Sequence, residues 1–451
     1  MEPADRYANL LGGKLRERAL LSAPRKLSEL EMQAHWFAGD FGTRFTTTDG
    51  DAVDVAQFGV WNREAGPDFS EAAVSIGGGE PTRGCIEFDP HARDWEHHGH
   101  ATNPDYENVV LHVFAAQGGA RFFTRTRAHR LVPQVLLDLH ALDEPPNPVP
   151  LAKPGLCCAP LRDLPEEKVR EILRGAAQFR MRKKAARMAR MAELHGSDEA
   201  LYQSLATTLG YKSNKLPFTL IAQRVPLKLL LKNREDAGAI LFGLSGFLDA
   251  DLEHFAGDAR GWLRELWDRW WRRRAEFERL AVARGEWRLG GQRPMNHPQR
   301  RVAALAQIVR HWPKIRALAK ACDVSALHNF FAELRDEFWD HHYTLTSARS
   351  EKRMALIGET RVAEMLANVF FPLAILSEPA RWADFEKLPA ALGNRRVETA
   401  ALRLLAGHPL RASLLKSIAN QQGLLQIYED FCMQDASDCA ACPFPQQLSR
   451  W

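Results

Sequence analysis

The chain has 451 residues, of which 45% are hydrophobic and 26% charged, which allows a large core and excludes a disordered or collagen-like chain. Its 60 lysines and arginines exceed its 56 acids by four, a balance too even to identify a partner. No run of 18 apolar residues occurs, and residues 1–24 lack the apolar stretch of a signal peptide. We therefore expect a cytoplasmic protein that does not span a membrane.

The first part of the chain mixes one helical pattern with several strand patterns. Residues 26–38 have helical spacing, with Ser28 as a candidate N-cap. Short strand-like segments follow, separated by turns that contain glycine or proline: 51–60, 68–76, 85–88, 109–114, 121–126 and 131–137. This order predicts a compact α+β domain over residues 1–142.

A proline-rich segment separates this domain from a helical one. Residues 143–155 contain five prolines in thirteen positions, which predicts a semi-rigid linker. Helical spacing then dominates, over 164–194, 198–209, 218–232, 235–248, 258–283, 299–320, 325–338, 352–376 and 395–429. We predict a helical domain over residues 156–451.

Three acids mark a candidate site in the first domain. Asp68 opens one predicted strand, and Glu87 and Asp89 lie on the next, after a GGGEPTR segment that can close a hairpin. Because strand side chains alternate, Glu87 and Asp89 point to the same face. Clustered carboxylates repel one another unless a proton or a cation neutralises them. Such hard oxygen ligands suit Mg²⁺ or Mn²⁺.

The same residues resemble the PD-(D/E)XK nuclease superfamily. Pro67 and Asp68, followed about twenty residues later by Glu87-Phe88-Asp89, match the first two parts of its motif. The resemblance implies a restriction-endonuclease-like α-β-β-β-α-β core and acids that hold a divalent metal for cleavage of DNA or RNA phosphodiesters. It also implies a supporting acid on the preceding helix, for which Glu31 is the candidate.

The sequence departs from that motif at Asp89, where the superfamily has lysine. Arg83, Arg93 or a histidine could take over the lysine's role. Alternatively, the domain is a catalytically inactive nuclease fold that binds nucleic acid or protein. Five histidines lie within 22 residues: His91, His97, His98, His100 and His112. We select His97 and His100, with Asp94, as candidate bases or ligands, and a zinc hydrolase built on these histidines is a third hypothesis.

A longer pattern resembles a bacterial family called domain of unknown function 2851. The resemblance is carried by GPDF at 66–69, GCIEFD at 84–89, LFGLSGFL at 241–248 and RPMNHPQRR at 293–301. It extends over most of the chain and implies a fold and a site, but no reaction.

The C-terminal cysteines predict a second metal site. Cys432, Cys439 and Cys442 have the spacing of thiolates that bind zinc or an iron–sulfur cluster. The spacing resembles the cluster loop of the endonuclease III glycosylases, whose fourth cysteine position is Leu448 here. Cys157 or Cys158 can supply the fourth ligand and so link the start of the helical domain to its end. This arrangement loosely resembles the iron-stapled nucleases, and zinc and 4Fe–4S both remain open.

The first long helical segment is strongly basic. Residues 161–190 contain ten lysines and arginines against four acids. Five of them are candidate nucleic-acid contacts: Arg180, Arg182, Lys183, Lys184 and Arg187. The alternative is a solvated helix face. Overall, we predict a metal-dependent, nuclease-like protein that acts on nucleic-acid phosphodiesters.

Overall fold

The structure is a computed structural model. It describes residues 2–11, 29–61, 66–118, 122–139, 142, 157–211, 213–249, 252–255, 257–290, 292–390, 395–432, 442–449 and 451. The predicted linker at 143–155 and the predicted ligand Cys439 lie outside these residues.

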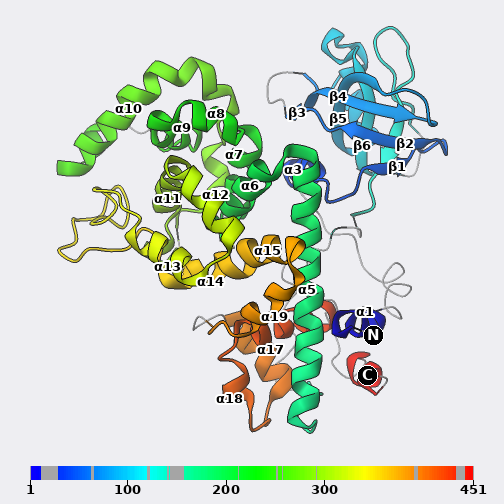
Figure 1. Ribbon diagram of the computed structural model, residues 1–451. Helices are drawn as coiled ribbons and strands as arrows, with labels where there is room; N and C mark the ends of the chain where they lie inside the picture. The colour runs from blue at the N-terminus through cyan, green and yellow to red at the C-terminus, as the bar shows by residue number, and fades with distance from the viewer. Residues whose placement is uncertain are drawn as a thin grey trace.

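A mixed sheet forms the N-terminal part of the described chain (Figure 1). Its strands are β1 (Arg44–Thr46), β2 (Ala52–Gln57), β3 (Val60–Trp61), β4 (Phe69–Ile76), β5 (Thr82–His91), β6 (Val109–Ala116) and β7 (Gln134–Leu136). The main strand order is β1-β2-β4-β5-β6-β7, and β3 pairs with β4. Neighbours from β1 to β5 are antiparallel, whereas β5–β6 and β6–β7 are parallel. The predicted α+β class is confirmed.

Strand β5 is covered on both sides. Helix α3 (Glu29–Phe37) packs on one face, where the Trp36 ring lies edge-on to Phe88 at 5.1 Å. The other face carries Glu87 and Asp89. It lies beneath the connection to β6, which contains α4 (Asp94–His97) and the 3₁₀ turns η1 (His100–Thr102) and η2 (Pro104–Tyr106). The acids are therefore held on a central strand beneath a compact crossover.

The helical part is arranged around the long helix α5 (Glu166–His195) (Figure 1). The other α-helices are α1 (Pro3–Leu11), α6 (Ser197–Leu209), α7 (Lys215–Arg224), α8 (Leu227–Lys232), α9 (Ala237–Leu244), α10 (Gly257–Phe277), α11 (Pro298–Arg310), α12 (Trp312–Ala321), α13 (Val324–Glu333), α14 (Glu359–Met365), α15 (Phe371–Ser377), α16 (Trp382–Glu386), α17 (Arg395–Leu405), α18 (Arg411–Leu414), α19 (Ile418–Ile427) and α20 (Phe444–Leu448). Two π-helical turns, η9 (Leu366–Phe370) and η11 (Tyr428–Cys432), continue α14 and α19.

Several predicted element boundaries are wrong for local reasons. The predicted helix 299–320 breaks at His311, because Pro313 lies in the first turn of α12 and cannot continue α11. The predicted helix 352–376 begins only at Glu359. Residues 354–355 stay in a loop because the buried Arg300 guanidinium donates hydrogen bonds to their carbonyls. Residues 122–126 form no strand, and only Arg125 bridges to Leu131.

The two parts share one hydrophobic core, which contains sheet residues such as Phe69 and helical residues such as Leu205. Helix α1 does not pack on the sheet. It packs on α5, and Tyr7 donates a hydrogen bond to Asp430 Oδ2 at 2.8 Å. Residues 3–11 thus belong to the helical part, although the predicted boundary placed them with residues 1–142.

One helical run in the described chain, Glu359–Ser377, is long and apolar enough to cross a membrane by length and composition. More than half of its apolar window, 56%, is buried inside the protein, as in the core helix of a folded domain. The cytoplasmic location stays a prediction.

Candidate metal centre

Asp68 and Glu87 hold each other in place across two antiparallel strands. The backbone N–H of Asp68 donates to Glu87 Oε2 at 3.0 Å, and the backbone N–H of Phe88 donates to Asp68 Oδ2 at 3.0 Å. Asp68 immediately precedes β4, and Glu87 lies within β5 with only 5% of its surface exposed. The first two acids predicted from the sequence are therefore adjacent and oriented.

Asp89 is fixed by two histidines. Its side chain is 1% exposed, with Oδ1 lying 2.9 Å from His98 Nδ1 and Oδ2 lying 3.2 Å from His112 Nε2. A carboxylate only accepts, so the Nε2 of a neutral His112 donates to Asp89, and its Nδ1 accepts from the Thr124 hydroxyl 2.6 Å away, whose oxygen also accepts from Gln134 Nε2. This network assigns the proton of His112 to Nε2, which donates to Asp89.

His100 brings a third imidazole to the acids. Its Nε2 lies 3.2 Å from Glu87 Oε1 and 3.9 Å from Asp89 Oδ1. The residue is only 8% exposed, and its ring stacks on Tyr106 at 4.0 Å. Despite the short distance to Glu87, the geometry is not that of a hydrogen bond, and this buried Nε2 has no hydrogen-bond partner.

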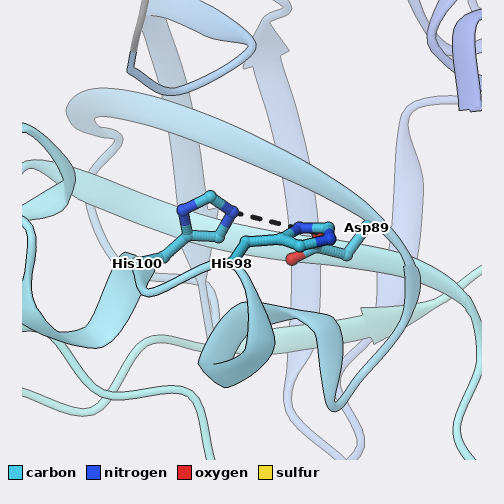
Figure 2. A group of neighbouring side chains, drawn as sticks. All are labelled: Asp89, His98 and His100. Atoms are coloured by element: carbon cyan, nitrogen blue, oxygen red, sulfur yellow. Dashed lines mark hydrogen bonds and ion pairs between the residues drawn. The ribbon is translucent and has the colours of Figure 1, made fainter.

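The connection between β5 and β6 makes this convergence possible. Gly99 separates His98 from His100 and has φ 77°, in the left-handed region that glycine adopts without a steric penalty. The turn lets α4 end at His97 and η1 begin at His100 in the space of three residues. Figure 2 shows the rings of His98 and His100 directed toward the carboxylate of Asp89.

Burial and the neighbouring charges shift the pKa values of this cluster toward its neutral forms. Burial, followed by the charge of Glu87, raises the pKa of Asp68 well above its usual range. Burial, followed by the charge of Asp89, raises the pKa of Glu87 to about 9. Burial lowers the pKa of His100 and of His112, which favours neutral imidazoles. Neutral imidazole and carboxylate oxygen are both good ligands for divalent metals.

Not every predicted residue joins this cluster. The side chain of His97 is 65% exposed and faces Asp94, with 3.9 Å between His97 Nδ1 and Asp94 Oδ1. His91 also pairs with Asp94, at 3.1 Å. Arg93 is exposed and likewise lies 3.9 Å from Asp94. Asp94 thus contacts the side chains at the start of α4 rather than the carboxylate cluster, and the structure places His97 on the surface beside Asp94.

Glu29 of helix α3 lies close enough to act electrostatically on this cluster. The charge of Glu29 raises the pKa of both Asp68 and Glu87, and burial and Asp89 raise its own pKa. Glu29 and the predicted Glu31 are two apart on the helix and so face different directions, and a supporting role for Glu31 stays a prediction. His112 could have been identified from the sequence as the one charged or polar residue in the apolar run of β6.

The basic residues of α5 mostly make contacts within the protein. Arg180 pairs with Glu429, Arg182 with Glu2 and Asp5, and Arg187 with Asp40. Lys184 Nζ is enclosed by the Ala367 carbonyl, Asn368 and Gln422, and Lys183 lies over the Phe179 ring. These contacts fix α5 to its neighbours. Contact of the five candidate residues with nucleic acid stays a prediction.

Three of the predicted metal-binding cysteines lie in one region. Cys157 Sγ donates to the Arg403 carbonyl oxygen at 3.1 Å, and Cys432 and Cys442 pack against the same hydrophobic cluster. Burial raises the pKa of Cys432 to about 12, with smaller contributions from Cys157 and Cys442. Cys158 is exposed. Within the described chain, the group whose ligand atoms all lie within 4.8 Å is instead Asp89, His98 and His100.

Comparison with known families supports the longer sequence pattern. The model of the family "Protein of unknown function (DUF2851)" matches residues 29–388. The chain belongs to this family. The match includes α3, the whole sheet, the carboxylate cluster and most of the helical part, and it ends before the C-terminal cysteines. No curated protein and no solved structure gives a significant match.

Proposed function

We propose that this member of the DUF2851 family is a divalent-metal-dependent nuclease whose site lies on the Glu87 face of the sheet. The observation that carries the proposal is the hydrogen-bonded pair of Asp68, partly buried just before β4, and Glu87, buried on β5, with no matching positive charge among the groups that act on them most strongly. A cation would relieve this repulsion, and Mg²⁺ or Mn²⁺ suits such oxygen ligands.

The order and pairing of the elements support the same proposal. Helix α3, the antiparallel strands β2, β4 and β5, the α4 crossover and the parallel strand β6 follow the α-β-β-β-α-β order that the motif implies. Asp68 and Glu87 would hold the cation, with Glu29 behind them. When bound, the cation would stabilise charge on the scissile phosphate and activate water.

Histidine takes the place of the missing lysine in this proposal. His98 and His112 hold Asp89, and the Nε2 of His100 faces Glu87 without a hydrogen-bond partner. A neutral imidazole at this position can accept a proton from water near neutral pH. His100 is therefore the assigned base or ligand beside the two acids.

The test is cleavage of fluorescent single- and double-stranded DNA and RNA by the full chain with Mg²⁺ or Mn²⁺. We expect D68N and E87Q each to lower the rate on the order of 100-fold or more, because each removes a charged ligand of the cation. E80Q, which changes an exposed acid in the β4–β5 turn, should cleave like the wild type. Equal cleavage by all four proteins would refute the proposal.

A binding module without cleavage is the second candidate. It is favoured by the two histidines that anchor Asp89 where a nuclease would have lysine. For such a protein, the logarithm of the affinity for nucleic acid would decrease linearly with the logarithm of the salt concentration. It would show no cleavage with any metal.

A further inference from the structure

We propose that Asp89, His98 and His100 bind a transition-metal dication, such as Zn²⁺ or Mn²⁺, at a position separate from the cation held by Asp68 and Glu87. The inference extends the proposed function by assigning a second cation to the same face of the sheet. It concerns binding, so it can be tested whether or not the protein cleaves nucleic acid.

The geometry is close to that of a metal site. Ligand atoms about 2.0–2.2 Å from a dication lie roughly 2.8–3.6 Å from one another. Here the Asp89 Oδ1 atom lies 2.9 Å from His98 Nδ1 and 3.9 Å from His100 Nε2. All three ligand atoms lie within 4.8 Å of one another. Movement of the His100 ring toward Asp89 and His98 would bring all three donor atoms to distances that one ion can bridge.

The unpartnered nitrogen of His100 is the independent observation that points to a ligand. A buried polar atom without a hydrogen bond is unfavourable, and folded proteins seldom leave one without reason. His100 is more than nine-tenths buried, and its Nε2 is directed at two carboxylates without a hydrogen bond to either. A metal ion between Nε2 and Asp89 would satisfy that atom.

The donor set selects the class of metal. Two imidazoles and one carboxylate suit zinc, manganese, iron or cobalt better than magnesium, which prefers oxygen ligands only. The Asp89 carboxylate is already positioned by His112 on its other oxygen, as the outer contacts of metal ligands commonly are. The half-exposed ring of His98, with 49% of its side chain accessible, leaves a path for the ion to enter.

The second cation would also explain the departure from the nuclease motif. A lysine at the position of Asp89 would bring one positive charge to the phosphate. An aspartate with two histidines can bring a dication to the same place, in the manner of sites that use two metals. In this arrangement a bound dication supplies the positive charge that a lysine side chain would otherwise supply, and the site is kept.

The experiment is titration of the metal-stripped full chain with Co²⁺, followed by visible absorbance and by displacement with Zn²⁺. H98Q removes a half-exposed ligand, and H97Q is its matched control because His97 is exposed and faces Asp94. Both variants keep all seven cysteines, so any binding to thiolates is the same in the two. Circular dichroism and thermal melting would verify that each variant folds.

We expect H98Q and a second variant, H100N, to bind Co²⁺ at least about tenfold more weakly at one site, because loss of a ligand should cost no less than loss of an outer contact. H97Q should match the wild type. Wild-type Co²⁺ binding in both H98Q and H100N would overturn the inference, even if D68N abolished cleavage. Binding as expected without cleavage under any metal would instead overturn the nuclease proposal and leave this site standing.

Discussion

At the scale of single residues, burial and neighbouring carboxylates disfavour the charged form of Glu87. This side chain lies beside Asp68, Asp89 and Glu29, and His100 Nε2 lies 3.2 Å from its Oε1. The hydrogen bond from the Asp68 backbone N–H lowers its pKa, but burial and the neighbouring carboxylates outweigh that effect. The group is thus protonated in the folded, metal-free chain at a pH where the unfolded chain would ionise it.

We expect the metal-free protein to lose stability as the pH rises from about 4.5 to about 9, the window between the unfolded and folded pKa values of Glu87. The folded state holds a proton that the unfolded state releases, so the free energy of unfolding decreases with pH. Asp68 contributes in the same direction. The slope should be roughly 1 kcal/mol per pH unit for each such group. Urea unfolding in EDTA across this range would measure it.

Two comparisons test that assignment. E87Q should flatten the slope because glutamine does not ionise, whereas E80Q, an exposed acid in a turn, should keep it. Added Mn²⁺ should also flatten the slope in the wild type, since a cation replaces the proton. A slope that is the same in E87Q and the wild type would show that other groups cause the pH dependence.

At the scale of elements, strand β5 determines where the acids lie, and its pairing with β6 requires a glycine. A Cβ atom at Gly84 would lie 2.4 Å from the Asn108 carbonyl oxygen and 2.4 Å from Val110 Cγ1. The first of these is backbone, and the backbone N–H of Cys85 donates to the same carbonyl. The two parallel strands could not keep this separation with a side chain present.

We therefore expect G84A to lower the free energy of unfolding by about 1–3 kcal/mol, as overpacking in a core does. G261A is the matched control, because a Cβ atom in that exposed part of α10 meets nothing within 4 Å. It should leave stability unchanged or raise it by up to about 1 kcal/mol. Chemical denaturation compares the two, and equal stability would show that β5 and β6 can separate without cost.

The sequence pattern predicted which strands and helices form more accurately than it predicted where they begin and end. Short strand-like runs between turns predicted β4, β5 and β6, and the alternation of strand side chains put Glu87 and Asp89 on one face, because both signals are local in the sequence. The predicted start of the helix over 352–376 was wrong because Arg300, about fifty residues earlier, donates hydrogen bonds to the carbonyls of the preceding loop. Contacts of that kind depend on the tertiary fold. The position of His98 beside Asp89 also depends on the tertiary fold, since it follows from the turn at Gly99.

At the scale of the whole molecule, the sheet and the helices are connected through α3. Gln223 of α7 donates to the Ala34 carbonyl of α3, and His195 at the end of α5 contacts the Phe37 carbonyl. These contacts join the helix beneath the sheet to the helical core. Patterns along the chain predicted a boundary between the parts, but they could not show that α3 would contact both the sheet and the helical part.

The cysteines indicate a second long-range contact, between the two ends of the helical part. Cys157 Sγ donates to the Arg403 carbonyl, and Cys157 and Cys442 each contribute to the raised pKa of Cys432. Residues from both ends of the helical part therefore meet beside α17. In the metal-free protein, burial keeps the Cys432 thiol neutral, whereas a bound metal would favour the thiolate. A metal bound by both Cys157 and Cys442 would close a long loop and so strongly reduce the conformational entropy of the unfolded chain.

We expect the chain, purified without oxygen, to contain either iron with sulfide and visible absorbance or zinc, and the double variant C432S/C442S to contain less of that metal than the wild type. Both proteins are compared in an H98Q background, so that metal bound by Asp89, His98 and His100 does not contribute to the difference. The variant should also melt at a lower temperature, because binding of a structural metal contributes several kcal/mol to folding. C322A, which removes a buried thiol at the end of α12, is the control and should keep the metal. Iron would support the resemblance to the iron-stapled nucleases, and zinc would indicate a structural zinc site. Equal metal content with and without the two cysteines, or no metal in either protein, would show instead that packing against the hydrophobic cluster alone holds Cys432 and Cys442 in place.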